Sequence, residues 1–256
     1  MNGLEGKVVL ITGGNKGIGK GIALEFAKRG AKLIIGCNSN PEMAKTTLDE
    51  LNKFTQAVAV QADVSSPESC EQLVNAAISN YGTLDVLVNN AAMQTHFSIL
   101  ESDLDNFKRI YNINLRAAFL LIQYSHKYLK KSGEGRVVLI SSVHGKRPLD
   151  VDAPYCISKG SMGMLAREAA IELARDKITV NIIAPAAVEI EGKSGDPRPM
   201  GSTFKTTGNI NWISKYPLGR VGMPSDTANM VCYLASKEAE HITGTTFRLD
   251  GGAMLL

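Results

Sequence analysis

The chain has 256 residues, of which 44% are hydrophobic and 21% are charged, and its 28 Lys and Arg outnumber its 25 Asp and Glu to give a formal net charge of +3. These values are typical of globular proteins and exclude a disordered chain, a collagen and a coiled coil. The basic residues are scattered rather than clustered, so we expect no nucleic-acid partner.

The cysteines and the apolar segments restrict the class of protein further. Cys37, Cys70, Cys156 and Cys232 form no C-x-x-C pair, and no His/Asp/Glu cluster has metal-ligand spacing, so we predict no metal site. Free thiols fit a reducing compartment. The start of the chain lacks the pattern of a signal peptide, and apolar runs such as 117–122 are too short to span a membrane. We therefore expect a cytoplasmic protein with no membrane segment.

Short, β-branched, almost continuously apolar segments alternate with longer amphipathic ones. The short segments read as strands buried on both faces of a parallel sheet. They are residues 8–11, 33–35, 57–60, 86–88, 137–140, 180–183 and, more weakly, 245–249. Helices are predicted over residues 17–29, from the N-cap Ser66 onward, and over 103–130, 154–175 and 224–235.

This alternation predicts the fold class. We expect an α/β protein with a single-domain Rossmann fold, in which a doubly wound parallel sheet of about seven strands carries helices on both faces. No linker divides the chain, so residues 1–256 are predicted to form one dinucleotide-binding and catalytic domain. Residues 189–215 are rich in Gly and Pro and lack a period, which is typical of a functional lid or of a disordered stretch.

A glycine-rich loop joins the first strand to the first helix. In Thr12-Gly13-Gly14-Asn15-Lys16-Gly17-Ile18-Gly19, the glycines allow a sharp turn and a close approach to a pyrophosphate. The helix start offers free N–H groups and the positive end of the helix dipole. A plain glycine turn is the alternative, but the strand–loop–helix context favours a dinucleotide site.

The end of the second strand bears on the choice between NAD and NADP. NAD-binding proteins place an acidic residue there to hold the ribose 2′-hydroxyl. Residues 36–40 contain no carboxylate, and Lys16 can reach the same region. An uncharged pocket beside a cation suits a 2′-phosphate, so we predict a preference for NADP over NAD. Alternatively, Lys16 is only solvated and Cys37 only fills the core.

Tyr155 and Lys159 are four residues apart in a predicted helix and so share one face. A phenol has a pKa of about 10, and a neighbouring ammonium lowers it, which makes the pair a candidate general acid/base. A Y-x-x-x-K pattern also occurs by chance as a surface pair. However, Ser142 and Asn90 follow two further strands, and the carboxyl ends of parallel strands share the edge where ligands bind.

Taken together, these motifs resemble the short-chain dehydrogenase/reductase family over nearly the whole chain. The resemblance is carried by Thr12-Gly13-x-x-x-Gly17-x-Gly19, Asp63-Val64, Asn89-Asn90-Ala91, Asn114, Ser142, Tyr155-x-x-x-Lys159 and Asp250-Gly251-Gly252. It implies four catalytic residues. Tyr155 exchanges a proton with the substrate oxygen, Ser142 orients that oxygen, Lys159 lowers the pKa of Tyr155 and binds the nicotinamide ribose, and Asn114 holds a relay water.

The resemblance also implies a set of residues that contact NADP, or NAD. Asp63 is expected at the adenine, Asn90 at the ribose region, and the backbone near Val188 at the carboxamide. The full predicted set is Gly13, Asn15, Lys16, Gly17, Ile18, Gly19, Asn38, Ser39, Asp63, Val64, Asn90, Ala91, Tyr155, Lys159, Pro185 and Val188.

The sequence departs from the family pattern in three places. Ala186 stands where the family has Gly and cannot take glycine-only backbone angles. Ile190 replaces a Thr and lacks a hydroxyl for the cofactor, so looser nicotinamide binding or a different lid closure is expected. Ala92 replaces a Gly, which is a mild change.

The predicted substrate pocket mixes polar and charged groups, which favours a sugar, a polyol or another small polar alcohol over a steroid. Its candidate residues are Gln94, His96, His144 and Trp212. The alternative is that the charged groups face solvent. His144 lies near Ser142, but no Gly-x-Ser-x-Gly elbow encloses the serine, so a hydrolase is not indicated.

The leading hypothesis is an NADP-preferring oxidoreductase that interconverts a secondary alcohol and a ketone or aldehyde by hydride transfer. A 3-oxoacyl-thioester reductase is an alternative, since Lys146, Arg147 and Arg198 could meet an acidic carrier protein. A catalytically silent nucleotide-binding regulator is another. The resemblance further implies a homo-oligomer, a tetramer or dimer, that pairs long helices. Gly160 and Gly163 would permit close approach there, or would pack within the subunit.

Overall fold

The structure is a computed structural model that describes residues 3–38, 41–95, 97–149, 152–190 and 215–256. All seven strands in this part of the chain belong to one parallel sheet with the order β3-β2-β1-β4-β5-β6-β7. The strands are β1 (Val8–Thr12), β2 (Lys32–Cys37), β3 (Ala57–Gln61), β4 (Val86–Asn89), β5 (Arg136–Ile140), β6 (Thr179–Pro185) and β7 (Thr246–Leu249). The predicted Rossmann fold is confirmed.

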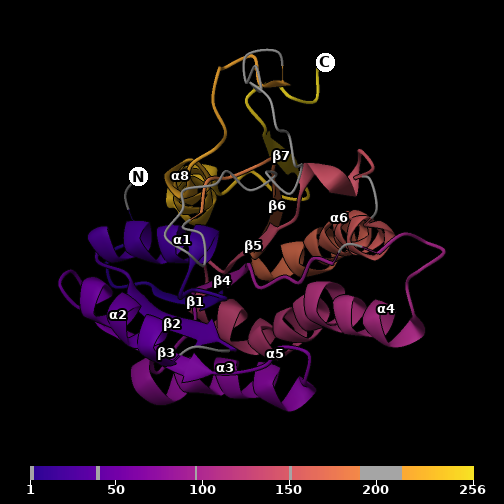
Figure 1. The fold of residues 1–256 in the computed structure, drawn as a ribbon. Coiled ribbons are helices and arrows are strands. Elements are labelled where there is room, and N and C mark those ends of the chain that lie inside the picture. Colours follow the sequence, from indigo (N-terminus) through magenta and orange to yellow (C-terminus); the bar gives the residue numbers. More distant parts are fainter. Residues whose placement is uncertain (1–2, 39–40, 96, 150–151, 191–214) are drawn as a thin grey trace.

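Helices connect the strands and cover both faces of the sheet (Figure 1). They are α1 (Gly17–Lys28), α2 (Pro41–Leu51), α3 (Pro67–Tyr81), α4 (Leu104–Tyr111), α5 (Ala117–Ser132), α6 (Ala153–Leu173) and α8 (Pro224–Ala235). Short helical turns are η1 (Asn112–Arg116), η2 (Val143–Gly145), η3 (Ala174–Asp176) and η4 (Lys237–Ala239). None of the helices in the described ranges is both long enough and apolar enough to cross a bilayer.

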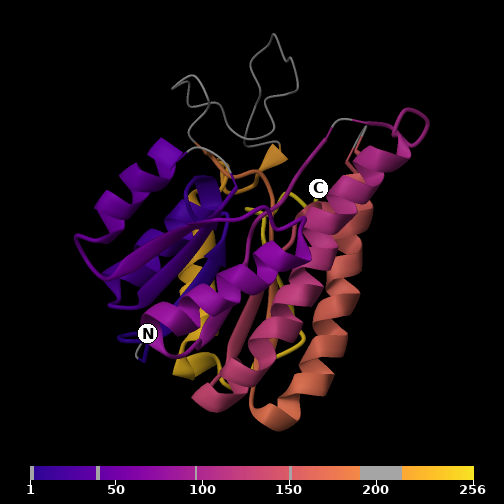
Figure 2. The same ribbon diagram turned by 90° about the horizontal axis from the view of Figure 1, so that it is seen from below.

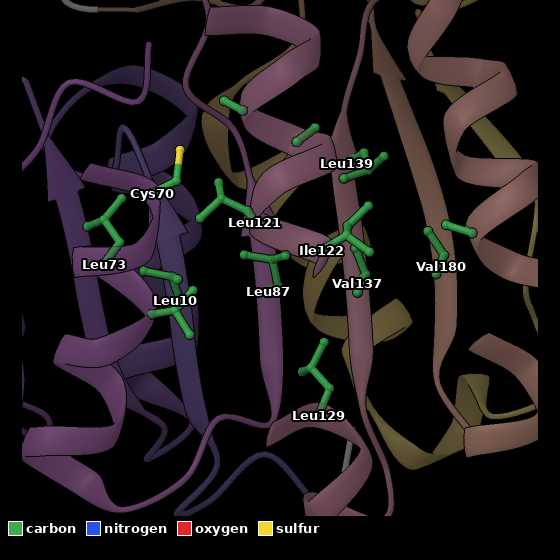
Figure 3. Packing of buried hydrophobic residues seen from close by; sticks show 14 of the residues in the cluster. Leu10, Cys70, Leu73, Leu87, Leu121, Ile122, Leu129, Val137, Leu139 and Val180 are labelled. Carbon is green, nitrogen blue, oxygen red and sulfur yellow. The ribbon is translucent and has the colours of Figure 1, made fainter. Parts of the chain in front are cut away.

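Each face of the sheet has its own core, because alternate residues of a strand point to opposite faces. On β1, Val8 and Leu10 belong to a core cluster that includes residues of α3, α5 and α6, whereas Val9 and Ile11 belong to one that includes residues of α1 and α8. Figure 3 shows the first core, where leucines and valines of the strands meet side chains from α3 and α5, including Leu73.

Two differences from the predicted helices have physical causes. The sequence analysis did not identify α2, in which the buried residues Ala44, Thr47 and Leu51 recur at helical spacing within an otherwise polar segment. The helix predicted over residues 103–130 is interrupted by the π-helical turn η1. Figure 2 shows the resulting α4–η1–α5 segment running beside α6.

Candidate active site

Four strands of the parallel sheet end at a common edge, where the predicted site residues gather. β1 ends at Thr12, β4 at Asn89, β5 at Ile140 and β6 at Pro185. The segments that follow these four strands carry the glycine-rich loop, Asn90, Ser142 and Val188, respectively. The topology therefore brings together residues that lie up to about 175 positions apart in the chain, as expected for a doubly wound sheet.

The glycine-rich loop is attached directly to the end of β4. The Thr12 hydroxyl oxygen accepts hydrogen bonds from the backbone N–H groups of Asn90 and Ala91, both at 2.9 Å. The Asn90 side-chain amide donates to the carbonyl oxygens of Thr12 (2.9 Å) and Gly13 (3.2 Å). Asn90 thus holds the loop in shape, a role that the sequence did not reveal.

Two glycines of the loop allow contacts that a side chain would block. A Cβ atom at Gly19 would lie 2.0 Å from the carbonyl oxygen of Gly13 and 2.6 Å from the Asn90 amide nitrogen. Gly17 has a φ of +53°, and a Cβ there would lie 3.1 Å from Cγ2 of Ile190. The segment after β6 therefore lies against the glycine-rich loop, and the two belong to one site.

The start of α1 fits an anionic ligand. Its N-cap is Lys16, whose exposed side chain has no acceptor atom and makes no cap hydrogen bond. The first N–H groups of a helix lack intrahelical partners, so those from Gly17 to Gly19 suit a phosphate. Asn15 is buried, and its carbonyl oxygen accepts a hydrogen bond from the Thr47 hydroxyl at 3.1 Å. The residues present therefore fit a dinucleotide.

Asp63 lies beyond β3 beside the end of β2. Burial opposes its ionisation, but hydrogen bonds from Ser65 and Asn38 and the positive charge of Arg109 lower the pKa of Asp63 below its ordinary value. Its carboxylate oxygen accepts the Ser65 N–H at 2.9 Å. A charged acceptor is thus fixed where the adenine contact was predicted, while the adjacent Val64 is buried.

Tyr155, Ser142 and Lys159 converge at the end of β5. Tyr155 and Lys159 lie one turn apart on α6, and the Lys159 ammonium is 5.8 Å from the centroid of the Tyr155 ring. The Tyr155 and Ser142 side chains are hydrogen-bonded to each other. Lys159 is buried and donates a hydrogen bond to the carbonyl oxygen of Ile140 at 2.8 Å. The Ser141 hydroxyl donates to the carbonyl oxygen of Lys159 at 3.0 Å, which ties α6 to the strand end.

Burial is the largest influence on the protonation equilibria of Tyr155 and Lys159. Burial raises the pKa of Tyr155 to about 12, and the charges of Asp152 and Cys156 act in the same direction, while the hydrogen bond with Ser142 opposes them. Burial also lowers the pKa of Lys159 to about 8. Loss of hydration is thus the largest influence on the Tyr155 phenol, and the lowering of its pKa by Lys159 stays a prediction.

Asn114 lies in the π-helical turn η1 and is fully buried. Its amide nitrogen donates to the Met93 carbonyl oxygen and to the Ser158 hydroxyl, both at 2.9 Å, and its amide oxygen accepts the Met93 N–H at 2.8 Å. Asn114 therefore links the segment after β4 to α6, one residue before Lys159. Both N–H groups of the Asn114 side-chain amide therefore already donate to acceptors within the protein.

The departures noted in the sequence have little effect on the backbone. Ala186 donates its N–H to the carbonyl oxygen of Leu249 at 3.0 Å. Among the described residues other than glycine, only Lys177 has a positive φ, so Ala186 adopts angles open to any residue. Pro185 ends β6, and Val188 is buried and pairs with Gly222.

The predicted substrate residues are only partly covered. Gln94 is exposed, and His144 is half-buried with Nδ1 3.2 Å from the carbonyl oxygen of Arg147. The His144 backbone N–H donates to the Ser142 hydroxyl at 3.2 Å, and burial lowers the pKa of the His144 ring. His96, Trp212 and Ser39 lie outside the described residues, as does most of the predicted lid.

Several supporting residues were not identified from the sequence. Ser158 bonds Asn114, Ser141 bonds Lys159, and a Cβ at Gly145 would lie 2.8 Å from the Lys159 carbonyl oxygen. Asp152 is the N-cap of α6 and is 1% exposed. An acidic residue just before a predicted helix is a recognisable N-cap signal, whereas the other contacts have no local pattern in the sequence.

Comparisons with known proteins agree with this geometry. A family model described as enoyl-(acyl carrier protein) reductase matches residues 13–254. Versicolorin reductase stcU of Emericella nidulans is 34% identical over 98% of this chain and 96% of its own length. The hydroxynaphthalene reductase-like protein Arp2 of Metarhizium anisopliae is 35% identical with the same coverage.

Solved structures are equally similar over the full length. Acetoin dehydrogenase YohF of Salmonella typhimurium superposes with a TM-score of 0.86 at 31% identity, covering 98% of this chain and 96% of that one. A short-chain dehydrogenase/reductase mutant of Serratia marcescens gives a TM-score of 0.86 at 30% identity, with 98% of both chains covered. Together with the site geometry, these matches show that the chain belongs to the short-chain dehydrogenase/reductase family of oxidoreductases.

Proposed function

We propose that this protein is an NADP-preferring oxidoreductase that interconverts a secondary alcohol and a ketone or aldehyde on a small polar molecule. The observation that carries the proposal is the convergence of the hydrogen-bonded Tyr155 and Ser142 with the buried Lys159 at the sheet edge that also bears the glycine-rich loop. A proton donor and a dinucleotide cradle at one edge are what carbonyl reduction needs.

The protein's own residues handle the proton. A bound nicotinamide supplies or accepts the hydride. During reduction, the Tyr155 hydroxyl donates its proton to the carbonyl oxygen of the substrate, and Ser142 donates a hydrogen bond to the same oxygen to hold it in place. During oxidation, the Tyr155 phenolate takes the proton back. A protonated Lys159 next to the phenol would stabilise the phenolate, and a cationic nicotinamide would act in the same direction.

The residues proposed to hold the dinucleotide are spread along the same edge. The N–H groups at the start of α1 would bind the pyrophosphate, and Asp63 would accept a hydrogen bond from the adenine. Lys159 would bind the nicotinamide ribose, and the backbone near Val188 the carboxamide. Asn114 would position α6 and the Met93 segment through its three hydrogen bonds.

The NADP preference rests on the residues after β2. Cys37 is buried, with its Sγ 3.6 Å from the carbonyl oxygen of Val60, so it fills the core. Asn38 is exposed, and so is Lys16 at the start of α1. The exposed cation of Lys16, together with the neutral side chain of Asn38 where an acidic residue would hold a ribose 2′-hydroxyl, favours a 2′-phosphate.

The substrate class rests on the polar character of the described residues that follow Asn90 and Ser142. Gln94 is exposed, and the half-buried His144 lies next to Ser142 through its backbone. Two similar structures are acetoin dehydrogenases, and acetoin is a small polar hydroxyketone. A carrier-linked acyl thioester is a second candidate, because Lys146 and Arg147 are exposed beside Ser142 and the matching family model names an acyl carrier protein.

We further propose that the protein acts in the cytoplasm as a homo-oligomer paired through α6. Ile157, Met164 and Ile171 are spaced seven residues apart, and their side chains are 49%, 54% and 76% exposed. A Cβ at Gly163 would meet no atom within 4 Å, whereas one at Gly160 would lie 3.1 Å from the Gly145 carbonyl oxygen. Gly160 therefore packs within the subunit, and Gly163 is free to face a partner helix.

The test of the proposed function is a turnover screen. Small hydroxyketones, sugars, polyols, 3-oxoacyl thioesters and steroids are assayed with NADPH, NADH and their oxidised forms, and the change in absorbance of the reduced nicotinamide is measured. We expect the highest kcat/KM for a small polar substrate with NADPH. Turnover of apolar ketones alone would refute the substrate class. Dinucleotide binding without any turnover would favour the silent regulator.

A further inference from the structure

Thr47 is a buried polar residue on the core-facing side of α2. It lies between Ala44 and Leu51 at helical spacing, and it is 1% exposed. Its hydroxyl donates a hydrogen bond to the carbonyl oxygen of Asn15 in the glycine-rich loop at 3.1 Å, across 32 positions of the chain. A buried hydroxyl is unfavourable unless it is hydrogen-bonded, so the contact with the loop accounts for a threonine where packing alone would favour an apolar residue.

The adjacent Thr46 shows the usual behaviour of a threonine in a helix. It is exposed and donates to the carbonyl oxygen of Glu42, one turn earlier on α2, at 3.0 Å. Such a bond within the helix is common for Ser and Thr. Thr47 instead bonds a different element, and α2 thereby holds the glycine-rich loop. The two neighbouring threonines thus differ in the partner of one hydroxyl.

Three consecutive residues of the loop are attached to three different elements. Gly14 donates its N–H to the end of β2 at 3.1 Å, and Asn15 accepts the Thr47 hydroxyl from α2. Lys16 is the N-cap of α1, with an extended backbone at φ −157° and ψ 163° and an exposed side chain. The direction of the Lys16 side chain therefore depends on where the Asn15 peptide is held.

Lys16 is the cation that this loop offers to a ligand. Lys20, one turn later on α1, is instead paired with Glu50 of α2 at 2.7 Å. Without the Thr47 hydroxyl, the buried carbonyl oxygen of Asn15 would lose its donor, and leaving it unpaired is unfavourable. The loop would shift toward another donor and move Lys16 with it. A charge-assisted bond to a phosphate is sensitive to such a shift, because it requires a short distance and a defined direction.

We propose that Thr47 is a positioning residue for the choice of cofactor: its hydrogen bond to Asn15 fixes the loop so that Lys16 points toward the 2′-phosphate of NADP. The inference rests on the proposed NADP preference. It assigns a role to α2, a helix that contributes no residue to the proposed dinucleotide or catalytic contacts. Thr47 acts through Lys16 and does not itself touch the cofactor.

The first experiment measures the Kd of NADPH and of NADH by fluorescence titration of the wild type, Thr47→Val and Thr47→Ser. Val has the shape of Thr without the hydroxyl. We expect Thr47→Val to weaken NADPH binding about fivefold and NADH binding less than about twofold, since the loss corresponds to one hydrogen bond that acts on one phosphate contact. Thr47→Ser retains the hydroxyl and should restore the wild-type ratio of the two Kd values.

Thr46→Val is the matched control, because it removes the hydroxyl of the neighbouring residue on the same helix. It should leave both Kd values as they are in the wild type. If Thr47→Val leaves both values unchanged, or weakens NADPH and NADH by the same factor, the proposal is overturned, since a merely structural role for the hydroxyl would not change the ratio.

The second experiment tests whether Thr47 acts through Lys16. Thr47→Val is combined with Lys16→Ala, and the ratio of the Kd values for NADH and NADPH is compared with that of Lys16→Ala alone. Residues that act through one another are not additive, so the second substitution should produce no further change in the ratio. A Thr47→Val effect that persists in full without the Lys16 side chain would refute the inference.

These measurements separate the inference from the proposed function. They need no turnover, so an inactive protein that binds dinucleotide still decides the role of Thr47. A wild type that binds NADPH and NADH equally refutes the NADP preference and the inference together, whereas a wild type that prefers NADPH, with the same ratio in Thr47→Val, refutes the inference alone. Thermal unfolding establishes that each variant is folded. If Thr47→Val does not fold, Thr47→Ala, with a residue that favours helix, replaces it and is held to the same expected ratio.

Discussion

The ammonium of Lys159 lies 5.8 Å from the centre of the Tyr155 ring, but its hydrogen bond goes to the carbonyl oxygen of Ile140 at 2.8 Å. Lys159 is thus hydrogen-bonded to the end of β5, while its ammonium also lies near the face of the Tyr155 ring. Since strand β5 also leads into Ser142, one strand end orients all three side chains.

Tyr155→Phe should abolish most turnover while preserving dinucleotide binding. The phenol hydroxyl is the proposed proton donor, and loss of a general acid or base typically costs roughly 10²–10⁴-fold in rate. Steady-state kinetics and fluorescence titration with NADPH measure the two properties. Tyr124→Phe on α5 is the matched control and should keep both. A Tyr155→Phe enzyme with wild-type kcat would contradict the assignment.

Lys159 should leave a signature in the pH dependence of stability. Its pKa is about 8 in the folded protein against 10.5 in an exposed lysine, so between these values the unfolded chain binds a proton that the folded chain does not. Stability therefore rises with pH across this window. The gain is at most about 3 kcal/mol, at about 1.4 kcal/mol per unit, and it is absent below pH 8.

Urea unfolding of the wild type and Lys159→Met at pH 7.5 and pH 10 measures this gain. The free energy of unfolding of the wild type should increase relative to that of Lys159→Met as the pH rises. Lys53→Met, which changes an exposed lysine, should show no such trend. A constant difference between the wild type and Lys159→Met would show that Lys159 is not buried as described.

Gly19→Ala should destroy dinucleotide binding. The added Cβ would lie 2.0 Å from the carbonyl oxygen of Gly13, so the glycine-rich loop must move away from the helix start. Isothermal titration with NADPH and NADP measures the loss, which we expect to exceed tenfold in Kd. Gly163→Ala, where a Cβ meets no atom within 4 Å, should bind as the wild type does. Equal affinity of the two variants would argue against the cradle.

Lys16→Ala should reduce kcat/KM with NADPH by about tenfold and change the value with NADH much less, because loss of one charge-assisted contact to a phosphate is worth about 1.4 kcal/mol or more. Lys28→Ala removes a cation at the other end of α1 and should affect neither cofactor. If the wild type has the higher kcat/KM with NADH, the NADP preference is wrong.

Ile171→Glu should dissociate the proposed oligomer. The side chain is 76% exposed in the single chain, and a buried, unpaired carboxylate at a helix–helix contact is strongly unfavourable. Light scattering after size exclusion should give a multiple of 27.5 kDa for the wild type and the protomer mass for the variant. Phe54→Glu, an exposed apolar residue after α2, is the control. A wild type that is monomeric at micromolar concentration would refute pairing through α6.

Much of the fold is encoded in local patterns of the sequence. Strands buried on both faces must be apolar along their length, and the loop after Thr12 needs glycine where the backbone turns to positive φ, so both leave local signals. The helix predicted over residues 224–235 has these same bounds in the structure. By contrast, α2 was missed, because only a few of its positions face the core.

The sequence by itself determined the parallel sheet, the glycine-rich loop and the identity of the Tyr155, Lys159 and Ser142 group, since each depends on residue types at fixed local spacing. Only the tertiary structure decided how these residues are held and how they titrate. The link from Asn90 to Thr12 spans 78 positions, and that from Asn114 to Ser158 spans 44. Hydration of a phenol depends on every segment that packs around it. A local pattern contains no record of such long-range contacts or of the water that they exclude.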